Sequence, residues 1–279
     1  MAALRSFGRR GWEELWLLPA FAFIALFYVL PLVNLVARSF SGEGGRPSLD
    51  QFRTILATPA FTAAWINSVL FAAASTAIAL VGGLLLAVWT AARRTRLRAA
   101  LLAVYALPYT MSGLVVAFGF VVLTGRNGLV NQILGLMFEG GPFVNLRSWG
   151  GLLAVFPFYN VPLAALILTP LVEKLGRDLS EAAAVCGAGR VATWALVLIP
   201  ALRPGLVAAG SLVFAAMMNA FGTTLAITGF SKNLLSLQIY AQSSDSGYNL
   251  PLASALAVVL MATTVAVLLV IGLIGRRRT

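Results

Sequence analysis

The sequence lacks most of the side chains on which enzymes and metal sites depend. It has no histidine and one cysteine, Cys186, so it offers no histidine-based metal site and no disulfide within the chain. Its two lysines, Lys174 and Lys232, do not close the glycine-rich pattern of a phosphate-binding loop. No grouping of nucleophile, base and metal ligands is recognisable along the chain. We therefore expect a non-catalytic protein with no catalytic residue, no metal site and no cofactor of its own.

Acidic side chains are also scarce. The chain has 9 Asp and Glu residues, and none falls inside a long apolar run, since Glu13 and Glu14 lie at the edge of the first one. Proton- and sodium-coupled carriers usually bind the driving ion with buried carboxylates or histidines, although carbonyl groups of an unwound helix can also bind sodium. An autonomous secondary transporter or channel is therefore the weaker alternative. If the protein moves a solute uphill, we expect a partner to supply the energy.

Long apolar runs dominate what is present. The 279 residues are 60% hydrophobic and 10% charged, with a mean hydropathy of +0.91, whereas soluble domains carry about 25% charged residues. Runs of about 20 apolar residues predict spanning helices, and the alternating ten-residue strands of an outer-membrane barrel are not visible. We predict an all-α polytopic membrane protein, a single transmembrane domain over residues 1–279. Its six predicted spans cover 15–38, 64–92, 99–123, 149–172, 205–229 and 251–275.

The basic residues predict the orientation of these spans. The formal net charge is +11, from 20 Lys and Arg against 9 Asp and Glu, and topology explains this excess better than a nucleic-acid partner, because cytoplasmic loops collect Lys and Arg. If both ends are cytoplasmic, fourteen basic residues lie on the inner side and six on the outer side. The outer six are Arg38, Arg46, Arg53, Arg126, Arg147 and Lys232. We therefore predict an N-in, C-in protein of a bacterial cytoplasmic membrane.

A charged, alanine-rich segment interrupts the apolar sequence between the fourth and fifth spans, over residues 173–204. Asp178 and Glu181 have the spacing of a capping box, which predicts that a short helix with small side chains begins here. The Gly187-Ala188-Gly189 turn would end it. Because the charge count places this segment in the cytoplasm, we predict that it is a docking helix for another protein. An ordinary amphipathic loop helix is the alternative.

The same segment carries a recognisable signature. Glu181-Ala182-Ala183 is followed after three residues by Gly187, and after nine more by Val197-Leu198-Ile199-Pro200. This resembles the EAA motif of the membrane subunits of ABC importers, in which the last part is I-x-L-P. The position between the fourth and fifth of six spans also fits that family, whose type I permeases have a MetI-like architecture.

The resemblance implies partners and a coupling role. It implies two ATP-binding-cassette ATPase subunits that bind ATP and Mg, a second similar permease or a second copy of this chain, and an extracytoplasmic solute-binding protein. The ATPase-coupling residues would be Asp178, Glu181, Ala182, Ala183, Gly187, Ala188 and Pro200. Small side chains there would let the segment enter a cleft of the ATPase, whose ATP-driven closure would reorient the spans.

Polar residues within the spans are candidates for a solute pathway or for hydrogen bonds between helices. The polar candidates are Tyr159, Asn160, Asn219 and Thr223, and Phe221 joins them because the segment around it in the fifth span could face the pathway. Segments 127–132 and 221–225 resemble those of importers for polyamines, iron, thiamine, sulfate or phosphonates. A sugar-importer permease is the alternative, and the substrate's charge stays open at this point.

Overall fold

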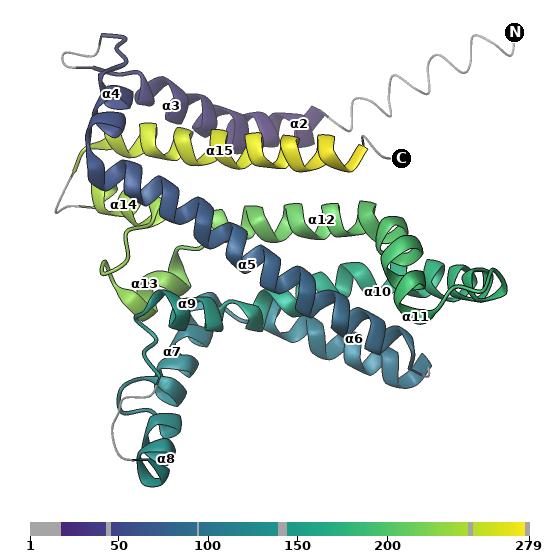
Figure 1. Cartoon of the computed structure of the whole chain (residues 1–279). Helices are drawn as coiled ribbons and strands as arrows, with labels where there is room; N and C mark the ends of the chain where they lie inside the picture. Colours follow the sequence, from purple (N-terminus) through teal and green to yellow (C-terminus); the bar gives the residue numbers. More distant parts are fainter. Residues whose placement is uncertain (1–17, 43–45, 94, 139–143, 245–247, 277–279) are drawn as a thin grey trace, which may run out of the picture. The chain divides into compact units, whose positions relative to one another are not determined.

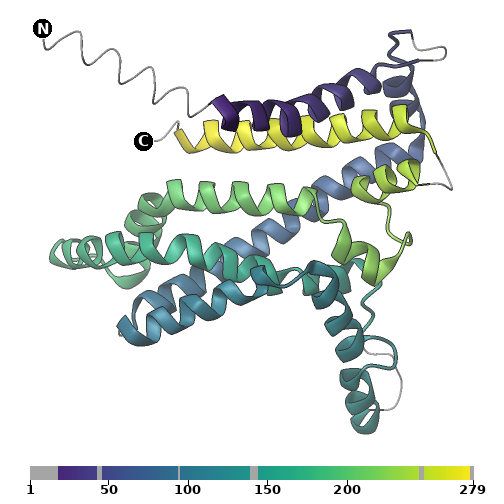
Figure 2. The same cartoon turned by 180° about the vertical axis from the view of Figure 1, so that it is seen from behind.

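The computed structural model describes residues 18–42, 46–93, 95–138, 144–244 and 248–276. Within these ranges the chain is helical and has no named strand (Figures 1 and 2). Six segments are long and apolar enough to cross a membrane: 21–39, 59–91, 113–137, 157–176, 190–218 and 250–273. The expected all-α fold with six spans is confirmed, and residues 15–17 of the first expected span lie outside the described residues.

The chain divides into two compact units, and the first comprises residues 1–59 and 238–259. It contains α2 (Leu18–Ile24), a π-helical turn (Ala25–Val29), α3 (Leu30–Ser39) and α4 (Asp50–Ala57), with most of α14 (Leu235–Ser243) and the start of α15 (Leu250–Arg276). Phe21, Phe27 and Tyr28 of the first span are 65%, 64% and 68% exposed. Large apolar side chains exposed in this way are stable against lipid or a partner rather than water.

The second unit comprises residues 60–237 and 260–279. It contains nearly all of α5 (Pro59–Ala91), and then α6 (Thr95–Thr110), α7 (Gly113–Thr124), α8 (Leu129–Met137) and α9 (Trp149–Val155). It continues with α10 (Pro157–Val185), α11 (Arg190–Ala192), a π-helical stretch (Thr193–Leu198), α12 (Ile199–Met218) and α13 (Gly222–Thr228). Its core lies where α5, α10 and α12 meet, around Ala87, Leu168, Val172, Leu202 and Ala209.

Small residues bring these helices close together. A Cβ atom added to Gly83 of α5 would collide with Ala164 of α10, and one added to Gly205 of α12 would collide with the Leu171 side chain of α10. In lipid there is no hydrophobic drive between helices, so close backbone approach and van der Waals packing hold them together. Helix α10 therefore packs closely against both α5 and α12.

Three interruptions of the helices matter for function. The expected third span, 99–123, is not one helix: α6 ends at Thr110 and α7 begins at Gly113, after Pro108 has removed one backbone donor. The expected fifth span, 205–229, is likewise split, because α12 begins at Ile199 and ends at Met218, and α13 begins at Gly222. A third break at Phe156 separates α9 from α10.

Candidate functional site

A cavity of about 390 Å³ lies at the three helix interruptions. Its lining includes Tyr159, Asn160, Asn219, Phe221 and Thr223. These are the five residues that the sequence suggests for a solute pathway, and the structure brings all of them to one cavity. Irregular backbone within a membrane domain is tolerated where it lines a cavity or is buried in protein. The three helix breaks meet this condition, because they line the cavity.

The carbonyl of Gly113 is the point where three helices meet. The Thr223 hydroxyl of α13 donates to this oxygen at 3.2 Å, and the Tyr159 hydroxyl of α10 lies 3.4 Å from it. A Cβ at position 113 would lie 2.6 Å from the Thr223 hydroxyl oxygen, so only glycine allows this approach. Sequence reasoning did not assign Gly113 to the pathway. The signal was the Ser112-Gly113 pair inside an apolar run.

The amides around the cavity differ in their hydrogen bonding. Asn160 is 1% exposed, and its side-chain nitrogen donates to the Met217 sulfur at 3.1 Å. Sulfur is a weak acceptor. Asn219 instead donates to the Ala215 carbonyl at 2.9 Å, within its own helix turn, and its side chain is exposed. Asn160 is therefore the buried amide with the weaker partner.

The lining of this cavity contains hydroxyls, amides, two thioethers and aromatic rings but no charged side chain. Hydroxyl and amide groups can both donate and accept hydrogen bonds. A polar solute of modest size can therefore exchange its water contacts for these groups without meeting a fixed carboxylate or ammonium charge.

The predicted coupling residues lie at the other end of the same helices. Helix α10 ends at Val185 in a Schellman motif: the Gly187 N–H donates to the Ala184 carbonyl at 3.0 Å, and the Ala188 N–H donates to the Ala183 carbonyl at 3.0 Å. Gly187 has φ +80°, a conformation that glycine adopts without strain. The expected Gly-Ala-Gly turn is confirmed.

The expected capping box is wrong. Asp178 and Glu181 lie inside α10, which runs unbroken from Pro157 to Val185, so no helix begins at Asp178. The local spacing matched a helix start, but the apolar residues that precede it continue the same helix. The predicted coupling segment is therefore the end of a spanning helix, a glycine turn and α11, and not a separate short helix.

Most of the predicted coupling residues are exposed. Asp178, Glu181, Ala182, Gly187 and Pro200 are exposed, Ala188 is half-buried and Ala183 is 8% exposed. Two apolar side chains that sequence reasoning missed flank the turn, Val185 at 90% and Val191 at 83% exposure. Isolated exposed valines are ordinary on a surface, but here both stand beside the glycine turn.

Helices α10 and α12 join the two regions. Tyr159 and Asn160 lie in the first turn of α10, and Glu181 lies four residues before its end. A rise of 1.5 Å per residue separates Asn160 from Glu181 by about 32 Å. Helix α12 begins beside Pro200 and ends beside Asn219. The Arg98 guanidinium lies 2.5 Å from the Glu173 carboxylate, which links the first turn of α6 to α10.

Comparison with known proteins gives a consistent result. Residues 79–279 match the family described as binding-protein-dependent transport system inner membrane component. The chain is 30% identical to the sulfate transport system permease protein CysT of Salmonella typhimurium over 263 residues, 91% of this chain and 89% of that protein. It is 29% identical to the molybdenum transport system permease protein ModB of Mycobacterium bovis, with 93% and 92% covered.

Two further similarities are more limited. The thiamine transport system permease protein ThiP of Brucella suis is 32% identical over 181 residues, which is 64% of this chain and 33% of that protein. The structure of a bacterial ABC transporter that imports the acidic polysaccharide alginate contains a chain that superposes with a TM-score of 0.79 at 18% identity, and each chain is covered fully. At this identity, the superposition establishes the fold alone.

Proposed function

The chain belongs to the family of binding-protein-dependent transport system inner membrane components, and from this premise we propose how this permease subunit is driven and what it carries. It is a multi-pass membrane protein with the type I ABC-importer fold. The cavity at the helix interruptions is the solute pathway, and the segment around Gly187 receives the force that opens and closes it.

One observation carries this proposal: α10 and α12 each have one end at the cavity and the other end near the segment around Gly187. Helix α10 contributes Tyr159 and Asn160 to the cavity and Glu181 to the coupling segment. Helix α12 begins beside Pro200 and ends at the cavity. Because α10 is continuous from the cavity to the turn, a displacement at the cytoplasmic turn can be carried along it over about 32 Å to the cavity.

The partners follow from the lack of a phosphate-binding loop in this chain. Two ATP-binding-cassette subunits bind ATP and Mg and dock on the coupling segment, where Asp178, Glu181, Ala182, Ala183, Gly187, Ala188 and Pro200 form or support the contact surface. A second permease, either a similar chain or another copy of this one, completes the pathway in the cytoplasmic membrane. A solute-binding protein delivers the solute from outside.

The proposed solute is a small oxyanion of the sulfate or molybdate kind. The cavity has no carboxylate to hold a polyamine or metal cation, and α7 and α10 begin at its edge. Helix N-termini carry partial positive charge and exposed N–H groups, which favour anions. Relatives named for sulfate and molybdenum transport support this choice over thiamine or a sugar.

Reconstitution tests the proposal. Vesicles that contain the permease, its ATPase and the binding protein should accumulate labelled sulfate or molybdate when ATP is present, and omission of ATP or of the ATPase should abolish uptake. An autonomous carrier or channel would instead move solute with the permease alone. Uptake by the isolated permease at the rate of the full complex would refute the proposal.

A further inference from the structure

We propose that Arg126 and Arg147 form a second anion site, on the extracytoplasmic side of the pathway cavity, where a small tetrahedral oxyanion binds on its way in. This inference rests on the proposed function for its direction of transport. It concerns a different cavity, of about 450 Å³, lined by the end of α7, residues 144–147 and α13.

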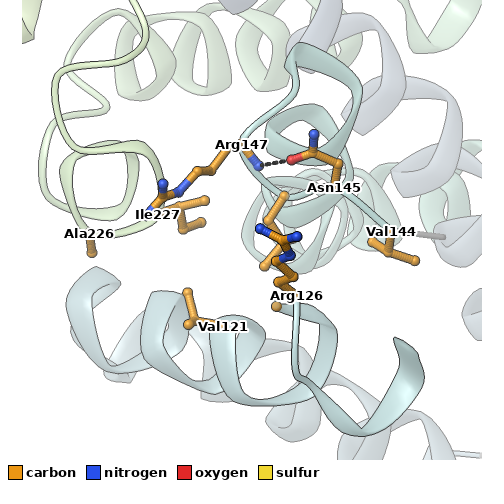
Figure 3. Close-up of a pocket in the computed structure, with 9 residues that line it drawn as sticks. Val121, Arg126, Val144, Asn145, Arg147, Ala226 and Ile227 are labelled. Atoms are coloured by element: carbon orange, nitrogen blue, oxygen red, sulfur yellow. Dashed lines mark hydrogen bonds between the residues drawn. The ribbon is translucent and has the colours of Figure 1, made fainter. Parts of the chain in front are cut away.

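Arg126 and Arg147 are unusual because the predicted orientation places them on the extracytoplasmic side of the membrane. The orientation predicted from the sequence leaves only six of the twenty basic residues outside, since basic residues are retained in cytoplasmic loops, and Arg126 follows the end of α7 at Thr124, within the apolar segment 113–137. Two of those six line one cavity, 21 positions apart in the sequence. Figure 3 shows Arg126 rising from the segment after α7, while the Arg147 side chain extends toward Ile227 of α13.

A buried asparagine fixes the two arginine-bearing segments against each other. Asn131 is 7% exposed, and its side-chain nitrogen lies 2.8 Å from the Gly125 carbonyl and 3.1 Å from the Val144 carbonyl. Its side-chain oxygen accepts from the Val144 N–H at 2.9 Å. The residue before Arg126 and a residue close to Arg147 are thus held by one side chain.

The backbone of Arg147 is fixed as well. Its N–H donates to the Asn145 side-chain oxygen at 3.0 Å, as drawn in Figure 3. The next residue, Ser148, caps α9 by accepting from the Gly151 N–H at 2.9 Å. The position from which the Arg147 side chain departs is therefore set before any ligand arrives.

The chemistry of the lining selects an oxyanion. A guanidinium group presents several N–H donors in a plane that matches the oxygens of sulfate or a carboxylate. Apart from the arginines and Asn145, the lining is glycine and the apolar residues Val121, Val144, Leu146, Ala226 and Ile227. A wall of low polarity strengthens the attraction between two cations and an anion.

The position of the site relative to the pathway supports a free solute over a docked protein side chain. Helix α7 contributes Gly113 to the pathway cavity and Val121 to the outer one, a separation of about 12 Å along the helix. Helix α13 likewise contributes Thr223 to the first and Ile227 to the second. An anion released at the outer cavity is therefore one short step from the pathway.

The test is equilibrium binding of labelled inorganic sulfate to the purified permease–ATPase complex in nanodiscs, without binding protein or ATP. We expect saturable binding that excess molybdate displaces. Arg126→Gln and Arg147→Gln should each weaken it about tenfold or more, because each removes a charge-assisted hydrogen bond, and the double variant should weaken it further. The matched control is Arg53→Gln, which removes an exposed outer-side charge from α4 and should leave binding unchanged.

Three results would overturn the site. The first is sulfate binding that is absent, or equal in the wild type and the double variant. The second is sulfate binding that is retained in the double variant while the binding protein no longer associates, since the arginines would then hold a protein carboxylate. The third concerns Glu139, which lies outside the described residues: binding that appears only in Glu139→Gln would mean that this carboxylate occupies the arginines.

Failure here is distinguishable from failure of the importer proposal. A complex that accumulates its solute with ATP but does not bind sulfate keeps the importer and loses the outer site. A complex that binds sulfate through the two arginines but shows no ATP-driven uptake keeps the outer site and refutes the importer proposal.

Discussion

The two ends of α10, one at the cavity and one at the proposed coupling turn, differ in burial and in hydrogen bonding within the chain. At the cavity, Asn160 and Thr223 are 1% and 7% exposed, and their polar groups have partners within the chain. At the coupling end, Val185 is 90% exposed and the positions around Gly187 face open space, with no atom within 4 Å of an added Cβ. One helix thus has a buried, hydrogen-bonded beginning and an open end.

This contrast fits the proposed division of the function between the chain and its partners. A buried polar group needs a hydrogen-bond partner, and at the cavity Asn160 and Thr223 find theirs within this chain. An exposed apolar end has no such requirement and gains free energy when a partner covers it. Substitutions at the cavity should therefore change how the solute binds, and those at the turn should change how the ATPase binds.

The largest effect is expected from Val185→Asp. Burial of a valine side chain contributes about 1.5–3 kcal/mol, and a charge at its place adds a desolvation cost, so the affinity for the ATPase should fall about 10- to 100-fold. Co-purification and titration of the ATPase against permease in nanodiscs measure this. Leu56→Asp is the control, because that side chain is 70% exposed on α4 and lies outside the six apolar spans. Equal losses in both variants would contradict a specific docking surface.

A smaller effect is expected from Gly187→Val. The φ of +80° at this position costs a non-glycine residue about 1–2 kcal/mol, so the turn should be populated about 5- to 30-fold less and ATP-driven uptake should fall within that range. The same substitution two residues on, Gly189→Val, meets φ −69° and open space and should have little effect. Uptake assays on vesicles with equal amounts of inserted protein compare the two. Equal activity of both variants would contradict the claim that transport depends on the Gly187 turn.

The smallest effect is expected at the cavity, from Thr223→Val. The substitution keeps the shape and removes the hydroxyl that donates to the Gly113 carbonyl, at a cost of about 0.5–1.5 kcal/mol. We expect the KM for solute uptake to rise about 2- to 10-fold while the ATPase still binds normally. Thr264→Val removes a buried hydroxyl that bonds only within α15 and should leave the KM unchanged. A Thr223→Val complex that lost its ATPase would contradict the separation of the two regions.

The sequence alone predicted the helical class and the six spans, because apolar length and basic-residue asymmetry are local signals. It also suggested five residues that the structure brings to one cavity, while the coupling role of the EAA spacing stays a prediction. The breaks at Met111–Ser112 and Asn219–Phe221 escaped prediction. An apolar run looks the same whether its helix is continuous or interrupted. What interrupts these helices is contact between distant residues, such as Gly113 and Thr223.

The error at Asp178 has the same origin. Its spacing to Glu181 is the local pattern of a helix start, yet the preceding apolar residues already form α10 and carry the helix through. Likewise, nothing in the sequence pattern joined Arg126 to Arg147, because Asn131 brings their segments together by hydrogen bonds to both. Local spacing predicts motifs well, and it does not predict which distant segments meet.

The most direct test of the central claim is substrate-stimulated ATP hydrolysis by the complex that carries Glu181→Lys. The substitution reverses the charge at an exposed position in the last turns of α10, far from the cavity, so membrane insertion should be normal. We predict that stimulation of hydrolysis by the loaded binding protein is lost. Full stimulation in this variant would contradict the claim that this end of α10 couples the permease to its ATPase.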